Sequence, residues 1–213
     1  MNHVSGIPVM TQARTSADAD VHADTGSCFA SRRQTPHQLL GPYFPVGYAP
    51  TSSGDLTARD STGISPQGEI IEVRGRVLTR EGRPVAGARL VIWQANSFGR
   101  YAHPNDSNPA PLDPSFSGFA EVLSDRDGAY RVKTVKPGAY PVPSGHIRPP
   151  HIHLEVHGKF ERLITQMYFP GEPLNARDPV LLSARHSDLL VTHPLPLQDG
   201  HRAFAFDIVL AQG

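Results

Sequence analysis

Residues 148–153 read RPPHIH and place two histidines two positions apart, directly behind an arginine and two prolines. If this segment is a strand, His151 and His153 point to the same face, about 6–7 Å apart along it, and the residues between and after them point into a core. Two imidazoles so placed can bind one metal ion, although a histidine pair on a solvated sheet face would have the same pattern. The prolines stiffen the backbone before the strand and limit where Arg148 can reach.

The further ligands would decide which metal is bound. No cysteine lies near the histidines, so a thiolate site is excluded. A site of two histidines and one carboxylate stays open, with Asp106, Asp113 and Glu155 as its candidates. Tyrosine is the other hard anionic ligand, and Tyr101 in GRYAHP and Tyr140 in KPGAYPVP both lie in long loops. A phenol titrates near pH 10, so only a strong Lewis acid would hold it ionised at neutral pH; otherwise each tyrosine is a packing residue.

The composition of the chain limits which partners and which compartment are expected. The chain has 213 residues and equal numbers of acidic and basic residues, 20 of each, so neither nucleic acid nor an anionic membrane is an expected partner. The single cysteine, Cys28, cannot form an intramolecular disulfide and is interpreted as an incidental thiol. Neither a secretory signal nor an apolar run of transmembrane length is recognised, and the cytoplasm is therefore the expected compartment.

The elements that must position these residues are short strands. Residues 1–34 are polar and without period, which predicts a flexible tail, and residues 35–68 are rich in proline, glycine and aromatics, which predicts an ordered arm. From residue 69, short segments rich in β-branched and aromatic residues alternate with turns. Residues 69–213 are therefore predicted to form an all-β domain, an antiparallel β-sandwich with long loops. Residues 175–190 could hold one short helix, limited by Pro179.

Several motifs together resemble one known family. WQANSFGRYAHPND, PLDPSF, DGAYRVKTVKPGAYP, RPPHIHLEV and LITQMYFPGEP are similar to segments of the intradiol ring-cleavage dioxygenases, above all of the protocatechuate type. The resemblance runs from about residue 35 to the end, in the family's order and at nearly its spacings. It implies a non-haem ferric ion, O2 as co-substrate, and cleavage of a catechol between its two hydroxyl-bearing carbons to a cis,cis-muconate. The implied iron ligands are Tyr101, Tyr140, His151 and His153.

Further roles follow from the resemblance alone. Arg148 corresponds to an arginine that stabilises negative charge on the substrate ring, and Gln166 to a glutamine of the same pocket. The alternative for Gln166 is a position on an exposed strand. Tyr140 matches the tyrosine that leaves the iron when the catechol binds. Residues 35–45, TPHQLLGPYFP, resemble the start of the iron-free subunit of protocatechuate enzymes. Gly41, Pro42 and Tyr43 are therefore expected to border the substrate, in this copy or a neighbouring one. The alternative for this stretch is a turn that clamps the arm. A homo-oligomer is expected.

The chain departs from the family's pattern beside the predicted substrate. Val142 and Pro143 stand where protocatechuate enzymes carry a large aromatic residue and a cation, Ile147 replaces another aromatic, and the loop is two residues shorter. Val142 and Ile147 are thus predicted to contact the ring substituent. Protocatechuate or a similar substituted catechol is the expected substrate. The alternatives are a catechol or hydroxyquinol dioxygenase and a non-catalytic sandwich module that binds a sugar or a protein.

Overall fold

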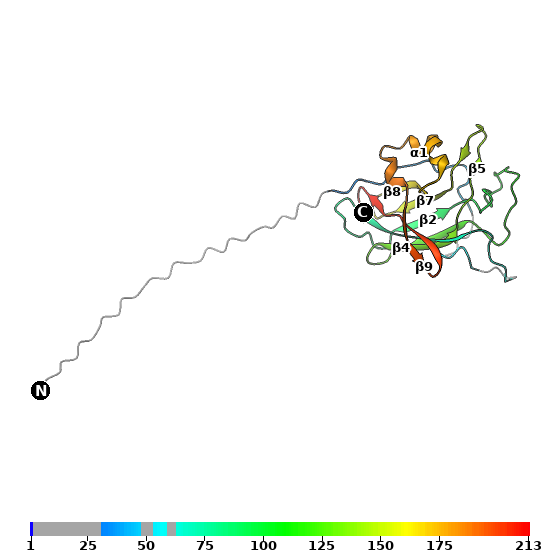
Figure 1. Ribbon diagram of the computed structural model, residues 1–213. Coiled ribbons are helices and arrows are strands. Elements are labelled where there is room, and N and C mark those ends of the chain that lie inside the picture. Colours follow the sequence, from blue (N-terminus) through cyan, green and yellow to red (C-terminus); the bar gives the residue numbers. More distant parts are fainter. Residues whose placement is uncertain (2–30, 48–52, 59–62) are drawn as a thin grey trace.

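The computed structural model describes residue 1 and residues 31–47, 53–58 and 63–213, and within them almost all regular structure is strand (Figure 1). The strands are β1 (Ile70–Thr79), β2 (Arg89–Trp93), β3 (Phe119–Leu123), β4 (Ala129–Val135), β5 (Tyr140–Pro141), β6 (Ile147–Arg148), β7 (His151–His157), β8 (Arg162–Tyr168), β9 (His193–Gln198), β10 (His201–Ala205) and β11 (Ile208–Leu210). Three short helical turns, η1 (Pro173–Arg177), α1 (Pro179–Leu182) and η2 (Ser187–Leu190), lie between β8 and β9. The predicted all-β class is confirmed.

The strands form two larger sheets. One has the order β3–β2–β7–β8 with every neighbour antiparallel. The other has the order β11–β1–β10–β9, with β4 also paired to β1. In this second sheet β1 runs parallel to β10 and to β11, so the sandwich is mixed rather than wholly antiparallel. The strands β5 and β6 form a separate two-stranded hairpin.

The period-two pattern of the strands produces the core between the sheets. In β1 the residues Ile71, Val73 and Val77 are buried, and in β7 the residues Ile152, Leu154 and Val156 are buried on one face, as the alternation predicts. His151 and His153 of β7 therefore lie on the opposite face of their sheet, away from this core. That outer face is where a site can be built.

The segment between β8 and β9 differs from the single short helix that the sequence allows. It contains a 3₁₀ turn on each side of the four-residue helix α1. Pro179 begins α1 instead of limiting it, because a proline at the first helical position has no N–H that needs a partner. Figure 1 shows this segment beside β8, at one side of the sandwich.

The N-terminal arm pairs with strands of both sheets. The Thr35 backbone N–H donates to the Val209 carbonyl of β11, and the Gln38 N–H donates to the Ile164 carbonyl of β8. The arm thus lies along the edge of β8 and continues toward the loops. The boundaries at residues 34 and 68 stay predictions, and Cys28 lies outside the described residues.

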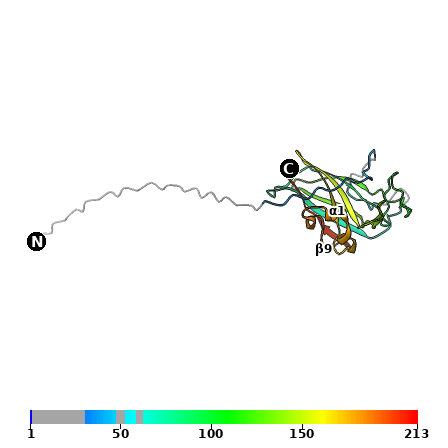
Figure 2. The same ribbon diagram turned by 90° about the horizontal axis from the view of Figure 1, so that it is seen from above.

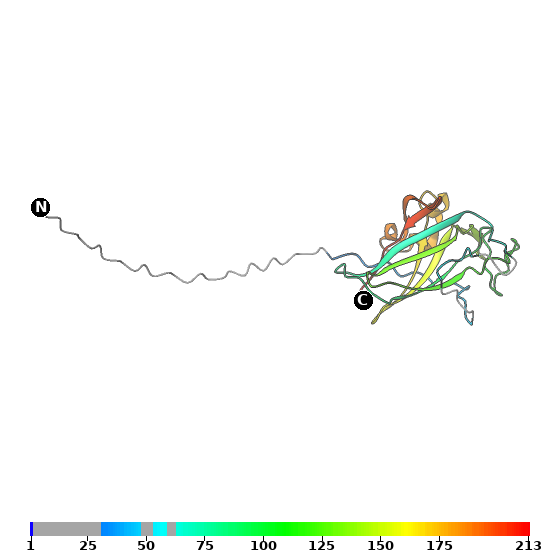
Figure 3. The same ribbon diagram turned by 90° about the horizontal axis from the view of Figure 1, so that it is seen from below.

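Long connections gather at one end of the sandwich. The loop between β2 and β3 and the β5–β6 hairpin project from the same end, which the views from above and below also show (Figures 2 and 3). In the described part of the chain, no helix is long and apolar enough to cross a membrane.

Candidate metal centre

The register of the antiparallel sheet places the two histidines at the centre of a polar row on its outer face. His153 of β7 lies opposite Trp93 of β2 on one side and opposite Gln166 of β8 on the other. His151 lies opposite Tyr168. All five side chains are buried, because the arm and the loops cover this end of the sheet. The predicted same-face placement of the histidines is what brings them together.

Each imidazole is held in a different way. The Nδ1–H of His151 donates to the Pro149 carbonyl at 2.7 Å, which leaves Nε2 of His151 with a free lone pair. His153 stacks on the Trp93 indole, with ring centroids 4.8 Å apart and an interplanar angle of 12°. The peptide before the strand therefore fixes the tautomer of His151, and this gives the RPPH sequence a physical role.

The two predicted tyrosine ligands come from the two long loops. Tyr140 begins β5 and pairs with Arg148 of β6 in the hairpin. The backbone N–H of Tyr101 donates to the Asp106 carboxylate at 2.7 Å, and this carboxylate also accepts the N–H of Asn108. The rings of Tyr101 and Tyr140 are perpendicular, with centroids 5.3 Å apart. Both loops are thus closed locally so that their tyrosines meet.

The donor atoms converge at distances that suit one shared ion. The Tyr140 hydroxyl lies 3.3 Å from Nε2 of His151, which lies 3.2 Å from Nε2 of His153. Two donors that are each about 2.1 Å from a common ion stand about 3.0–3.6 Å apart when the angle at the ion is between about 90° and 120°. The Tyr101 hydroxyl is buried and has no hydrogen-bond partner of normal geometry among the described residues. Tyr140, His151 and His153 therefore fit a single metal ion, and Tyr101 offers a further hydroxyl from the ring that packs on Tyr140.

The protonation states of the four groups support the same interpretation. Burial, together with the nearby Arg148 cation, lowers the pKa of His151 well below its usual value and that of His153 to about 3. Both imidazoles are therefore neutral near pH 7, as a metal ligand must be. Burial raises the pKa of Tyr101 and of Tyr140 above the usual value for a phenol. Protein groups alone keep these phenols protonated, so ionising them requires a strong cation at the site.

Arg148 lies beside this cluster in a dense network. Its Nε and Nη2 donate to the two carboxylate oxygens of Asp178 at 2.8 and 3.1 Å. Nη2 also lies 2.8 Å from the Gln166 side-chain oxygen and 2.7 Å from the Tyr168 hydroxyl. The Gln166 amide donates to the Leu39 carbonyl of the arm at 2.8 Å. Gln166 is fully buried, so the exposed-strand interpretation of this residue is wrong.

The arm brings a glycine and an aromatic ring onto the centre. Gly41 has a φ of +75°, and a Cβ atom there would lie 3.2 Å from Cε1 of His153. Tyr43 packs on Tyr101 with ring centroids 4.5 Å apart, while Pro42 between them is exposed. The arm therefore approaches the centre of its own chain.

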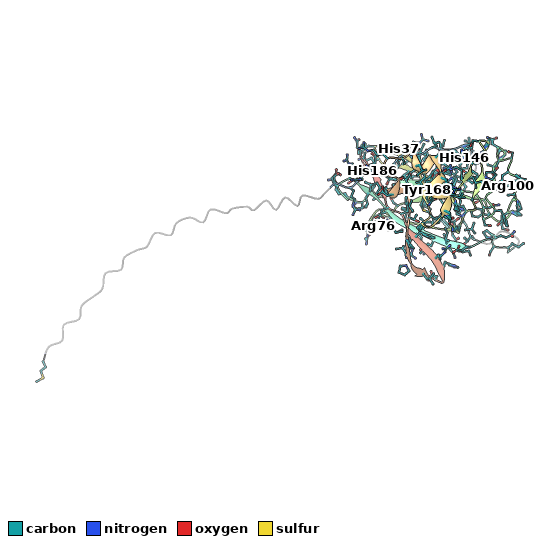
Figure 4. The ribbon with its side chains drawn as sticks, turned by 45° about the horizontal axis from the view of Figure 1, so that its top comes forward. His37, Arg76, Arg100, His146, Tyr168 and His186 are labelled. Carbon is teal, nitrogen blue, oxygen red and sulfur yellow. The ribbon has the colours of Figure 1, made fainter. Side chains whose placement is uncertain are left out.

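The two hairpin residues predicted to contact the ring substituent differ in burial. Val142 is half-buried and packs against the cluster that contains Trp93, Tyr101 and Tyr140. Ile147 is 54% exposed, on the outside of the same hairpin. Figure 4 shows His146 of this hairpin and Arg100 nearer the loop end of the molecule than Tyr168.

The three carboxylates that the sequence left open as ligands have other partners. Asp106 bonds the backbone of the Tyr101 loop, Asp113 accepts the N–H groups of Gln67 and Ser115, and Glu155 pairs with Arg162. No cluster of three histidine, cysteine, aspartate or glutamate side chains suited to a metal occurs among residues 1, 31–47, 53–58 and 63–213. A site of two histidines and one carboxylate is therefore not formed there.

The sequence was compared with known proteins. The family profile described as dioxygenase matches residues 39–212. The protocatechuate 3,4-dioxygenase beta chain of Burkholderia cepacia is 44% identical over 165 residues, which cover 73% of this chain and 70% of that one. This chain belongs to the intradiol ring-cleavage dioxygenase family. The predicted resemblance is confirmed.

Other intradiol dioxygenases match in sequence and in structure. Catechol 1,2-dioxygenase 2 of Acinetobacter lwoffii is 34% identical over 154 residues, which cover 65% of this chain and 52% of that one, so the chain spans about half the length of this relative. The dioxygenase domain of a dioxygenase carbohydrate-binding protein fusion from Streptomyces sp. SirexAA-E superposes with a TM-score of 0.65 at 29% identity, covering 85% of this chain and all of that one. The fold of this chain is thus the intradiol dioxygenase fold.

Three residues around the centre were not singled out from the sequence: Trp93, Tyr168 and Asp178. Trp93 and Tyr168 could have been found from strand register, because they are the cross-strand neighbours of the two histidines. Asp178 lies 30 residues after Arg148, and nothing in the spacing indicates that they meet.

Proposed function

We propose that this protein cleaves the aromatic ring of a catechol with O2, between the two carbons that carry hydroxyl groups. The observation that carries the proposal is the convergence of Tyr140, His151 and His153 donor atoms at 3.2–3.3 Å, next to the buried hydroxyl of Tyr101. Two phenols and two neutral imidazoles are a hard donor set that suits ferric iron. Protocatechuate or a similar substituted catechol is the first substrate to test.

A ferric ion held by these four residues would supply Lewis-acid chemistry by drawing electron density from a bound catechol ring. Tyr140 would hold the ion as a phenolate, and this phenolate could accept one of the two hydroxyl protons of an incoming catechol. The choice of Tyr140 for this role rests on its place in the family's motif, while the backbone of Tyr101 is held through Asp106.

The remaining residues position charge and exclude water. Arg148 supplies a fixed cation beside the centre, where negative charge develops as the ring reacts with O2. The reaction breaks the carbon–carbon bond between the two hydroxyl-bearing carbons and adds both atoms of O2, one to each carbon, which gives a dicarboxylate. Trp93, Tyr43 and Phe44 form an aromatic wall that keeps the centre away from bulk water.

A catechol or hydroxyquinol dioxygenase is the alternative. The β5–β6 hairpin favours this alternative. Val142 packs against the cluster that contains Tyr140, and its apolar side chain cannot pair with a carboxylate on the substrate ring. The two alternatives share one chemistry and differ only in the ring substituent. The protein is further proposed to act as a homo-oligomer.

A substrate panel tests the proposal. Purified protein is loaded with ferric iron and offered protocatechuate, catechol and hydroxyquinol, with His151→Ala as the control. We expect a visible absorption band from tyrosinate bound to iron, ultraviolet loss of at least one substrate, and a product with the mass of the substrate plus two oxygen atoms. A colourless iron-loaded protein, or a semialdehyde product from cleavage outside the two hydroxyls, would contradict the proposal.

A further inference from the structure

The guanidinium of Arg148 is held along one edge by a single carboxylate. Asp178 accepts from both Nε and Nη2, which is the bidentate geometry that fixes the plane of a guanidinium as well as its position. Gln166 and Tyr168 lie near Nη2 only, so they leave rotation about that nitrogen open. Nη1 has no acceptor among the residues that the structure describes. The Asp178 contact is therefore what decides the direction in which Nη1 points.

Asp178 is itself fixed with little freedom. It is 1% exposed, and its carboxylate also accepts the backbone N–H of Leu181 at 3.1 Å, as the N-cap of α1. The backbone of Arg148 is fixed independently, because it pairs with Tyr140 in the β5–β6 hairpin. The arginine is thus held at its backbone by the strand of a predicted iron ligand and at its head by the α1 segment.

We propose that Asp178 is a positioning residue for ring cleavage, because it orients the Arg148 guanidinium so that Nη1 faces the centre. This inference rests on the proposed function. Among the described residues Asp178 makes no hydrogen bond with a predicted ligand, so its removal leaves the four donor atoms in place. Its effect belongs to the rate of the reaction and not to metal binding.

The first test is Asp178→Asn, with Glu72→Gln as the matched control. Glu72 is also a buried carboxylate bonded by arginines, Arg74 and Arg131, but it lies in the other sheet. We expect Asp178→Asn to lower kcat about 10- to 100-fold, because a misoriented catalytic group slows a reaction by about that much. The visible band and the KM for the catechol should stay near the wild-type values. Glu72→Gln should lower the melting temperature and leave kcat unchanged.

The second test removes Asp178 where Arg148 is already absent. In the wild-type background, Asp178→Asn leaves a buried guanidinium unpaired and should lower the melting temperature. In the Arg148→Ala background, the same substitution removes an unpaired buried carboxylate and should raise the melting temperature. It should also leave kcat within about twofold of Arg148→Ala alone, since residues that act through one another are not additive. The double variant retains no unpaired charge from this pair, so it folds even where the single variant does not.

The outcomes separate the inference from the function that it rests on. If the wild type cleaves no catechol, the proposed function fails and the positioning role fails with it. If the wild type cleaves catechols and Asp178→Asn keeps the wild-type kcat, only the positioning role is overturned. A further large loss of kcat from Asp178→Asn in the Arg148→Ala background would overturn it as well, because Asp178 would then act independently of the arginine.

Discussion

At the scale of single residues, the structure distinguishes a hydroxyl kept for chemistry from one kept for packing. Tyr101 and Tyr130 are both buried tyrosines. The Tyr130 hydroxyl donates to the Phe206 carbonyl at 2.6 Å, whereas the Tyr101 hydroxyl has no partner of normal geometry in the described parts of the chain. A buried hydroxyl without a bond destabilises a fold, so the state of Tyr101 supports the proposed ligand role.

This contrast gives a prediction with opposite signs for two phenylalanine substitutions. Tyr101→Phe should abolish ring cleavage and change the visible band, and it should raise the stability of the iron-free protein by up to about 1 kcal/mol. Tyr130→Phe should lower stability by about 1 kcal/mol, because the Phe206 carbonyl loses its donor, and should leave colour and turnover unchanged. Denaturant unfolding and absorption spectra measure both. Normal turnover by Tyr101→Phe would rule out its ligation.

Residue types and spacing alone do not predict the four candidate ligands as one set. The resemblance to the family is what groups them. Strand alternation correctly placed His151 and His153 on one face. For each loop tyrosine alone, packing was the simpler interpretation, because the course of a long loop depends on contacts such as that between Tyr101 and Asp106, which spacing does not reveal. Asp178 was missed for the same reason, since its contact with Arg148 is set by the tertiary fold.

At the scale of elements, the N-terminal arm packs directly against the candidate metal centre. Gly41 carries the positive φ that lets the arm turn, and a Cβ atom added there would lie 3.2 Å from Cε1 of His153. Gly47 has nearly the same backbone, with a φ of +79°, but a Cβ atom there would meet no atom of the described residues within 4 Å. The pair separates the effect of backbone strain from the effect of crowding the histidine.

Alanine substitutions at these two glycines should therefore cause a similar loss of stability but different effects on activity. Each should destabilise the protein by about 1–2 kcal/mol, because a side chain disfavours this backbone region. Only Gly41→Ala should also shift the visible band and lower kcat, since its Cβ would press on Cε1 of His153. Spectra and initial rates with the best substrate of the panel measure the difference. Equal kcat values for the two variants would mean that the arm does not border the centre.

The strands themselves were predictable where they alternate, and less so where they do not. Alternating apolar residues predict that β1 and β7 are strands with one buried face. The structure confirms this, because those residues lie in the core. The parallel pairing of β1 with β10 and β11 was missed, because periodicity within a strand carries no information about the direction of its neighbour. Pro194 and Pro196 kept β9 from being recognised, yet prolines are tolerated in this strand at the edge of its sheet.

At the scale of the whole molecule, the candidate centre joins segments that are far apart in the chain. The arm, the β2–β3 loop, the β5–β6 hairpin and β7 all contribute to it. An ion bound by the loop, the hairpin and β7 would cross-link these three parts of the native state, and it has no comparable site in the unfolded chain. Binding of the ion should therefore stabilise the fold.

Removing iron should lower the melting temperature by roughly 5–15 °C. A free metal concentration of about 100 to 1,000 times Kd adds about 3–4 kcal/mol to the free energy of unfolding, and in a domain of this size that shifts the melting temperature by this amount. The measurement compares ferric-loaded protein with protein treated with a chelator under reducing conditions. Tyr101→Phe serves as the control and should show a much smaller difference. Identical melting of the loaded and the stripped wild type would contradict a ligand set that spans the fold.

The arm joins segments from opposite ends of the described domain. Thr35 and Val209 of β11 exchange two hydrogen bonds, although they are separated by 174 positions. Gln38 adds a second anchor, because its N–H donates to the Ile164 carbonyl of β8. Contacts between residues so far apart in the sequence close long loops, so the arm is expected to dock late in folding and to complete the cover over His153 last.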